Sequence, residues 1–336
     1  MKVLLRAVRL ACLALAGATT AQAACSLEKV TEMPLLSLGA HYAVMVGIED
    51  VVRPMVVDTG AETTLIKASV VRELSLKPDE TMEVARPVVG IGQTSGDVQP
   101  NAVPSKLAFG DLVFHDRSTT VAAMDDGQTP ESNSIGLLGD DILSKYDVEF
   151  DFPSHRLAFY REIACYDTFV PWAGVFATIP FEHRGAKILV DIMLNQERTQ
   201  AIVDTGNNMS FISKNASALW GAAESDLSLT KGKLQVPFNQ AAALVVRAYP
   251  FFKVTIGGDV FIGKKMNVVD VNFPQASANL GLDYWSSRKI WISYPHEWMF
   301  IANDPMRAKL VYPVNAAPPQ QPSPRAGPVA ETDGPN

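Results

Sequence analysis

Two short stretches of this sequence place an aspartate directly before Thr-Gly. Asp58 opens the stretch DTGAETTLI, and Asp204 opens the stretch DTGNNMSFI in the second half of the chain. Two carboxyl groups held about 3 Å apart cannot both ionise, so they share one proton. The ionised member can then take a proton from water, while the protonated member hydrogen-bonds a developing oxyanion. If the fold brings the two loops together, this pair can activate water for hydrolysis without a metal ion.

The segments around the two motifs are repeated along the chain. Residues 43–58 (AVMVGIEDVVRPMVVD) align without a gap with residues 189–204 (LVDIMLNQERTQAIVD). Further downstream, residues 137–159 align with residues 279–301. Such internal similarity indicates two homologous halves of about 145 residues each, joined near residues 162–172.

The local patterning predicts strands in most of the chain. Apolar, partly β-branched runs lead into both DTG motifs, and apolar residues alternate with others over 148–152 and 290–294. Only short helices are expected, over 68–76, 140–146 and 216–222. The sequence therefore predicts an all-β fold with two lobes, and not alternating strands and helices.

With both motifs in view, the sequence resembles the aspartic proteases of the retropepsin/pepsin superfamily. DTGAETTLI is close to the retropepsin form of the active-site loop, and GLLGDDIL matches the glycine-bearing turn and helix that support this loop in the family. The resemblance covers about residues 35–301 and points to exported bacterial members with two retropepsin-like repeats on one chain. It implies a bilobal pepsin-like fold of two β-barrel lobes, with the cleft between them.

The resemblance also implies a role for each residue of the two loops. Asp58 and Asp204 would be the catalytic pair, one from each lobe. Four residues that follow them would brace the loops: Thr59, Gly60, Thr205 and Gly206. The threonines would hydrogen-bond across the pseudo-twofold axis, and the glycines would allow a tight turn and offer N–H donors to the carboxylates. The residues leave open which aspartate acts as the base, because such a pair titrates as a unit.

A substrate-covering flap is expected in the first half only. Residues 88–93 lie where the family keeps a glycine-bearing hairpin, with Gly90 and Gly92 supplying freedom and Ile91 forming an apolar tip. An ordinary hairpin is the alternative. Glu62 falls where retropepsins carry an acid that contacts the substrate backbone, and a surface acid paired with a nearby arginine is the alternative there.

Residues 1–23 have the features of a secretory signal peptide. They combine a basic start, a short apolar core and an Ala-Gln-Ala cleavage site. The apolar run falls short of the roughly 20 residues that a membrane span needs. A periplasmic or secreted protein is therefore expected, with Cys25 and Cys165 left in the mature chain. These two cysteines are expected to form a disulfide, with two free thiols as the alternative.

The expected organisation places an N-terminal lobe with the flap at 24–165 and a C-terminal lobe at 166–312. Residues 313–336 are rich in proline and are expected to be a disordered tail. The net charge of −7, with no basic run beyond the first residues, argues against nucleic acid as a partner. The spacing of histidines and cysteines matches no metal-site pattern.

These features predict an aspartic endopeptidase that hydrolyses peptide bonds with no cofactor. Its substrates would be peptides or unfolded proteins, and it would act as a monomer because one chain carries both half-sites. The alternative is a catalytically weak or inactive protein of the same fold that binds peptides or partners in the cell envelope. Retention of both aspartates favours the enzyme, while the pair Asn207-Asn208 in the second loop keeps the alternative open.

Overall fold

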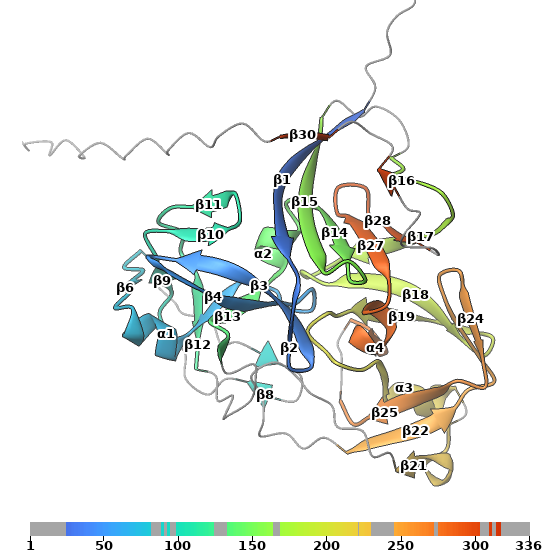
Figure 1. Ribbon diagram of the computed structural model, residues 1–336. Coiled ribbons are helices and arrows are strands. Elements are labelled where there is room, and N and C mark those ends of the chain that lie inside the picture. Colours follow the sequence, from blue (N-terminus) through green and yellow to red (C-terminus); the bar gives the residue numbers. More distant parts are fainter. Residues whose placement is uncertain are drawn as a thin grey trace, which may run out of the picture.

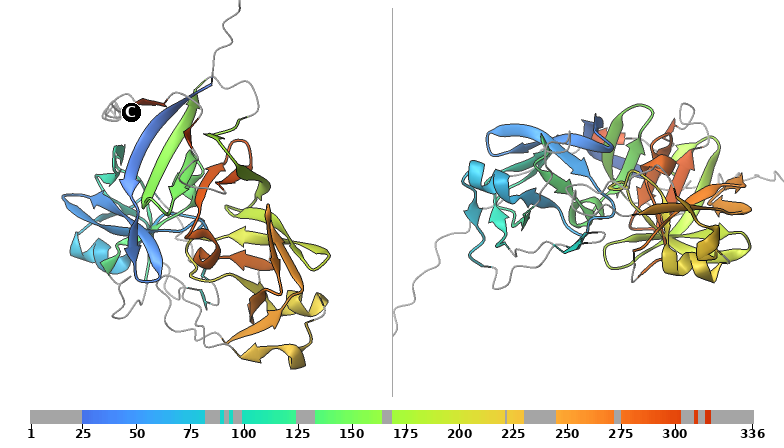
Figure 2. Two further views of the ribbon diagram at one scale, coloured as in Figure 1. Left: turned by 45° about the vertical axis from the view of Figure 1, so that its right-hand side comes forward. Right: turned by 90° about the horizontal axis from the view of Figure 1, so that it is seen from below.

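The structure is a computed structural model that describes residues 25–81, 89–90, 93–94, 99–123, 133–163, 169–220, 222–229, 245–271, 275–302, 309–310 and 314–316. Two β lobes lie on either side of the molecule and share a central sheet (Figure 1). Seen from below, the blue-green first lobe and the yellow-orange second lobe lie side by side (Figure 2). The predicted all-β, bilobal fold is confirmed.

The first lobe is built around one main sheet. Its strands are β2 (Leu36–Leu38), β3 (His41–Ile48), β4 (Val51–Val57), β5 (Leu65–Lys67), β10 (Leu107–Phe109), β11 (Leu112–Phe114), β12 (Thr120–Ala122) and β13 (Gly136–Leu138). They follow the order β11-β10-β3-β4-β13-β5-β12, with β2 beside β3. Two small pairs accompany this sheet: β6 (Lys77–Pro78) with β9 (Ala102–Val103), and β7 (Val89–Gly90) with β8 (Gln93–Thr94).

The second lobe repeats this topology. Its strands are β18 (Ile188–Leu194), β19 (Glu197–Val203), β20 (Phe211–Ser213), β21 (Ser228–Leu229), β22 (Val246–Pro250), β23 (Lys253–Ile256), β24 (Asp259–Ile262), β25 (Lys265–Val269) and β26 (Ala278–Leu280). In each lobe the strand before DTG, β4 or β19, runs parallel to a later strand, β13 or β26. That later strand is also antiparallel to the strand after DTG, β5 or β20. The DTG loop is therefore held between the same three strands in both lobes.

The central sheet joins the two halves. Its strands are β1 (Ser26–Pro34), β14 (Asp147–Asp151), β15 (Arg156–Ile163), β17 (Phe176–His183), β27 (Lys289–Ser293), β28 (Trp298–Ala302) and β30 (Val314–Ala316). They follow the order β17-β28-β27-β14-β15-β1-β30. The halves meet where β14 pairs antiparallel with β27, so a continuous backbone ladder fixes the position of one lobe against the other.

Acidic residues in the central sheet are buried on its second face. The alternation of apolar and acidic residues over 148–152 is also typical of a strand whose acidic face is exposed to solvent. Val148 and Phe150 face the main hydrophobic core. On the other face Glu149 is fully buried, lies 2.7 Å from Arg156 and accepts a hydrogen bond from the Trp172 indole N–H. Trp172 belongs to the segment that connects the lobes, so this connection covers the second face and the carboxylate is stabilised by its partners.

The helices are short, as expected. They are α1 (Ala68–Glu73), α2 (Asp140–Leu143), α3 (Lys214–Leu219) and α4 (Leu282–Trp285), accompanied by the 3₁₀ turn η2 (Glu224–Asp226). The expected helices over 68–76, 140–146 and 216–222 correspond to α1, α2 and α3, each ending earlier than predicted. The prediction did not include α4, although it occupies the position in the second repeat that α2 occupies in the first. In the described part of the chain, no helix has the length and apolar character to cross a bilayer.

The predicted start of the disordered tail at residue 313 is wrong. Val314–Ala316 forms β30, which pairs in parallel with Leu27–Lys29 of β1. Just before it, β29 (Lys309–Leu310) pairs with β16 (Trp172–Ala173). The proline-rich composition predicted disorder, but the outer side of β1 offers backbone donors and acceptors that this stretch satisfies. The remainder of the predicted tail lies outside the described residues.

Two truncations test this boundary. A chain ending at Ala316 should unfold at the same temperature as the full-length protein. A chain ending at Tyr312 loses the pairing of β30 with β1 and should be less stable by ~1–2 kcal/mol, since each exposed backbone hydrogen bond contributes modestly. Thermal unfolding followed by circular dichroism measures both. Equal unfolding temperatures of the two truncated chains would show that the pairing of β30 with β1 does not stabilise the protein.

Cys25, directly before β1, is disulfide-bonded. The other two cysteines of the chain, Cys12 and Cys165, lie outside the described residues. The first residue of β1, Ser26, pairs with Ile163 at the end of β15, two positions before Cys165 in the sequence. The Cys25–Cys165 pairing remains a prediction, as does the signal peptide at 1–23, which also lies outside the described part.

Candidate active site

The two DTG loops meet where the lobes face each other. Asp58 follows β4 and Asp204 follows β19. The Asp58 N–H donates to the Leu138 carbonyl at 3.0 Å, and the Asp204 N–H donates to the Leu280 carbonyl at 3.0 Å. Each aspartate therefore starts its loop at a position that the neighbouring strand, β13 or β26, fixes through the backbone.

Thr59 and Thr205 lock the loops together through reciprocal hydrogen bonds. The Thr59 N–H donates to Thr205 Oγ1 at 3.1 Å, and the Thr205 N–H donates to Thr59 Oγ1 at 3.0 Å. Each hydroxyl in turn donates to a carbonyl of the opposite lobe, Thr59 to Val203 at 2.9 Å and Thr205 to Val57 at 2.8 Å. All four bonds are buried and cross the boundary between lobes, so they set the separation of the two aspartates.

Gly60 and Gly206 leave the space that the carboxyl groups occupy. Each donates its N–H to the aspartate of its own loop at 2.8 Å. A Cβ on Gly60 would lie 2.5 Å from Cγ of Asp204, and a Cβ on Gly206 would lie 2.2 Å from Cγ of Asp58. Each glycine thus packs against the carboxyl group of the opposite lobe, and this packing brings Asp58 and Asp204 face to face.

The carboxyl pair is buried and coupled. Asp58 is 7% exposed and Asp204 is 5% exposed. Burial and the neighbouring charge of Asp204 raise the pKa of Asp58 to about 8, against the opposing effects of the Lys187 ammonium and the Gly60 N–H. The two side chains are also close enough to hydrogen-bond each other. One proton is therefore retained in the pair well above the usual pH range of a carboxyl group.

Asp204 accepts further hydrogen bonds from two asparagines. Asn207 Nδ2 donates to Asp204 Oδ2, and Asn279 Nδ2 donates to the same oxygen at 2.7 Å. Neither asparagine was predicted to take part in the site. The repeat alignment held the signal: Asn279 stands where the first half has Leu137, directly before a Leu-Gly pair, and a polar residue at that buried position is unusual.

A second layer of hydrogen bonds supports each loop from behind. In the first lobe, Thr64 Oγ1 accepts from the Gly139 N–H at 3.1 Å, and the Thr64 N–H donates to Asp141, which also binds Arg117. In the second lobe, Ser210 makes the equivalent contacts. It accepts from the Gly281 N–H at 3.0 Å and donates its own N–H to Asp283 at 2.7 Å. The GLLG segment and its repeat thus hold both loops in the same way.

Glu62 lies at the edge of the site and is paired with a lysine of the other lobe. Its side chain is 66% exposed, and its Oε1 is 3.7 Å from Nζ of Lys187. Lys187 also donates to the Gly60 carbonyl. Of the two alternatives for Glu62, the ion pair is present, though its partner is a lysine and not the expected arginine. Contact of Glu62 with substrate remains a prediction.

The expected flap position carries a small hairpin. Val89 pairs with Thr94 and Gly90 with Gln93, which makes β7 and β8 antiparallel. The residues of its turn, Ile91 and Gly92, lie outside the described part of the chain. The role of this hairpin as a flap remains a prediction.

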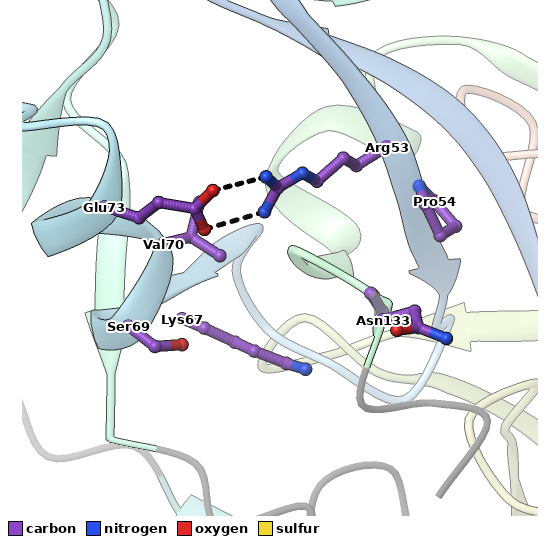
Figure 3. Close-up of a pocket in the computed structure, with 8 residues that line it drawn as sticks. Arg53, Pro54, Lys67, Ser69, Val70, Glu73 and Asn133 are labelled. Atoms are coloured by element: carbon purple, nitrogen blue, oxygen red, sulfur yellow. Dashed lines mark hydrogen bonds and ion pairs between the residues drawn. The ribbon is translucent and has the colours of Figure 1, made fainter.

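Among the residues that the structure describes, two of the pockets lie away from the carboxyl pair. The first, of about 370 Å³, lies in the first lobe, where Arg53 and Glu73 face each other in an ion pair (Figure 3). The second, of about 250 Å³, lies between the lobes and is lined by His41, Asn208 and Asp283 among others. Asn208 is the repeat counterpart of Glu62. The second loop therefore presents a neutral amide to this pocket at the position where the first loop carries a carboxylate.

A bilobal all-β fold whose lobes each present a DTG loop to the other is the architecture of the pepsin-like and retropepsin-like aspartic proteases. Residues 44–142 match the model of the family described as aspartyl protease. The resemblance seen in the sequence is therefore confirmed for the part of the first lobe that carries Asp58. A search of curated proteins finds no match.

Two solved structures illustrate the similarity. The aspartic proteinase from Irpex lacteus has 15% sequence identity and a TM-score of 0.49, with 81% of this chain and 96% of that chain covered. A retropepsin-like aspartic protease from Rickettsia conorii has 17% identity and a TM-score of 0.30, with 40% of this chain and 96% of that chain covered. The match of residues 44–142 to the aspartyl protease family supports a protease-type function.

Proposed function

We propose that this protein is an aspartic endopeptidase in which a water molecule is activated between Asp58 and Asp204. The observation that carries the proposal is the pair of buried carboxyl groups, held face to face by the threonine hydrogen bonds and the two glycines. With one proton in the pair, the ionised carboxylate accepts a proton from water. The protonated carboxyl group hydrogen-bonds the carbonyl oxygen of the peptide.

The substrates proposed are peptides or unfolded proteins, because an extended backbone fits between two lobes more readily than a folded domain. No cofactor is required for this chemistry. Export to the periplasm or the medium is supported by the features of residues 1–23 and by the disulfide at Cys25, since disulfides persist in oxidising compartments.

Hydrolysis of unfolded casein by the mature protein, measured from pH 3 to pH 8 with and without pepstatin, tests this proposal. Cleavage that pepstatin suppresses supports the endopeptidase. Binding of casein-derived peptides without cleavage at any pH would instead support the alternative, a peptide-binding protein of the same fold.

Hydrolysis should lose activity over the pH range in which the carboxyl pair loses its shared proton. Since the raised pKa of Asp58 is about 8, the pair keeps its proton at neutral pH and loses it as the pH rises through that value. We therefore expect activity to persist at pH 7 and to decline above about pH 8. Initial rates on a quenched fluorescent peptide, from pH 4 to pH 9.5, measure this decline. An activity that already vanishes at pH 6 would contradict it.

A single chain should suffice for activity. Asp58 and Asp204 already meet within one chain, so dimerisation is not needed to complete the site. Activity per molecule is expected to stay constant on dilution from micromolar to low nanomolar protein. A steep loss on dilution, in parallel with dissociation seen by light scattering, would show that the site forms between chains.

A further inference from the structure

The two carboxyl groups of the site have different hydrogen-bond donors. Asp204 accepts from the Gly206 N–H and from the side-chain amides of Asn207 and Asn279. Asp58 accepts from the Gly60 N–H. The repeat counterparts of the two asparagines are Ala61 and Leu137, and neither side chain can donate. The asymmetry is therefore built into the sequence of the two halves.

The additional donors favour the ionised form of Asp204. An amide nitrogen of asparagine only donates, and a carboxylate oxygen that receives two such bonds is stabilised as an anion. A proton on Oδ2 of Asp204 would point at the N–H groups of both asparagines, and these groups would repel it. If both amides were turned over, the carbonyl oxygens of Asn207 and Asn279 would lie against that same oxygen, and a single proton could satisfy only one of them. Both asparagines are buried, at 1% and 0% exposure, so bulk water cannot replace a lost bond.

The charged groups around the pair do not reverse this preference. Lys187 faces Asp58 from the second lobe and favours its ionised form. However, its ammonium group is engaged by the Gly60 carbonyl and lies 3.7 Å from Glu62 Oε1, which offsets part of its charge. The raised pKa of Asp58 agrees with a proton that resides on this residue.

We propose that Asn207 and Asn279 are positioning residues that keep Asp204 as the ionised member of the pair, so that Asp58 carries the shared proton. This deepens the proposed function and rests on it. The water oxygen would bond to the peptide carbonyl carbon as a water proton moves to Asp204 and the Asp58 proton moves to the carbonyl oxygen. The Asp204 proton would then pass to the amide nitrogen as the C–N bond breaks, and one hydroxyl of the intermediate would return a proton to Asp58.

The ionisation of each carboxyl group can be followed by ¹³C NMR in protein labelled at aspartate Cγ. The Asp58→Asn and Asp204→Asn variants identify the two resonances. In the unaltered protein, Asp204 should ionise at lower pH than Asp58. In Asn279→Ala, the ionisation of Asp204 should move up by about one to two pH units, because a hydrogen bond to the anion is lost. Asn207→Ala gives a second, independent measurement.

Asn267→Ala is the matched control. Asn267 lies in the same lobe and donates to the Ser210 carbonyl at 2.9 Å, behind the loop and not to a carboxylate. Removal of the Asn267 side chain should leave the pH at which Asp204 ionises unchanged. Earlier ionisation of Asp58 in the unaltered protein, or shifts in Asn279→Ala and Asn207→Ala no larger than in the control, would overturn the proposal.

The NMR titration needs no peptidase activity. It therefore tests the roles of Asn207 and Asn279 even if the protein proves not to hydrolyse peptides. If the protein hydrolyses peptides, the acidic limb of its pH–rate profile should move to higher pH by the same amount in Asn279→Ala. A lower rate at every pH, without movement of that limb, would indicate a merely structural role for Asn279.

Discussion

Asp58→Asn and Asp204→Asn are each expected to lower peptide hydrolysis by at least ~10³-fold, because neither carboxyl group can supply both the base and the acid. An asparagine preserves the size of the side chain and its place between the opposite glycine and the threonine bonds. Rates measured on the same peptide substrate, with protein purified under conditions that exclude host proteases, give the comparison. Residual hydrolysis above a few per cent in either variant would remove the paired mechanism.

The unfolding temperature of the Asp58→Asn variant shows whether its loss of hydrolysis comes from the missing carboxyl group or from unfolding of the protein. A carboxyl group whose pKa is higher in the folded than in the unfolded state stabilises the fold below its unfolded pKa. It loses this contribution as the pH rises toward its folded value, about 8 for Asp58. The neutral asparagine does not have this dependence. At pH 7 the variant should therefore unfold at the same temperature as the unaltered protein or higher, and the difference should shrink near pH 4.

Gly206→Ala is expected to lower hydrolysis by about 10²-fold or more, although residue 206 takes no part in the chemistry. The added Cβ would lie 2.2 to 2.3 Å from three atoms of the Asp58 carboxyl group, so that group must move. A displacement of about 1 Å in a reacting group costs about this much in rate. Gly60→Ala should behave in the same way, because its Cβ would lie 2.5 to 2.7 Å from the Asp204 carboxyl group.

Gly47→Ala provides the control for this prediction. Gly47 lies in β3 of the first lobe, and a Cβ there would be 3.4 Å from the Cβ of Ala108, which is close to an ordinary contact. This variant should keep nearly full activity. Activity measured as kcat/KM, together with thermal unfolding, separates the effects. Near-normal activity in Gly206→Ala would mean that the two carboxyl groups do not face each other as closely as the structure places them.

The sequence by itself determined the class of fold and the location of both loops. Asp58 and Asp204 each follow an apolar strand and precede a Leu-Gly pair, and this order is the same in both halves. These signals are local: a strand, a tight turn and a short helix each depend on neighbouring residues. The duplication then implied that the second loop would take the place of the first in an equivalent lobe.

Only the tertiary structure decided what surrounds the two carboxyl groups. Lys187 and the Gly60 carbonyl are 127 residues apart, and Asn279 contacts Asp204 across 75 residues. Likewise, β30 joins β1 from the other end of the chain, against the composition of its own segment. Such contacts depend on which side chains two folded surfaces present to each other, and no local propensity encodes that. The repeat made the two halves look alike, whereas the environment of each aspartate was set by long-range packing at positions where the halves differ.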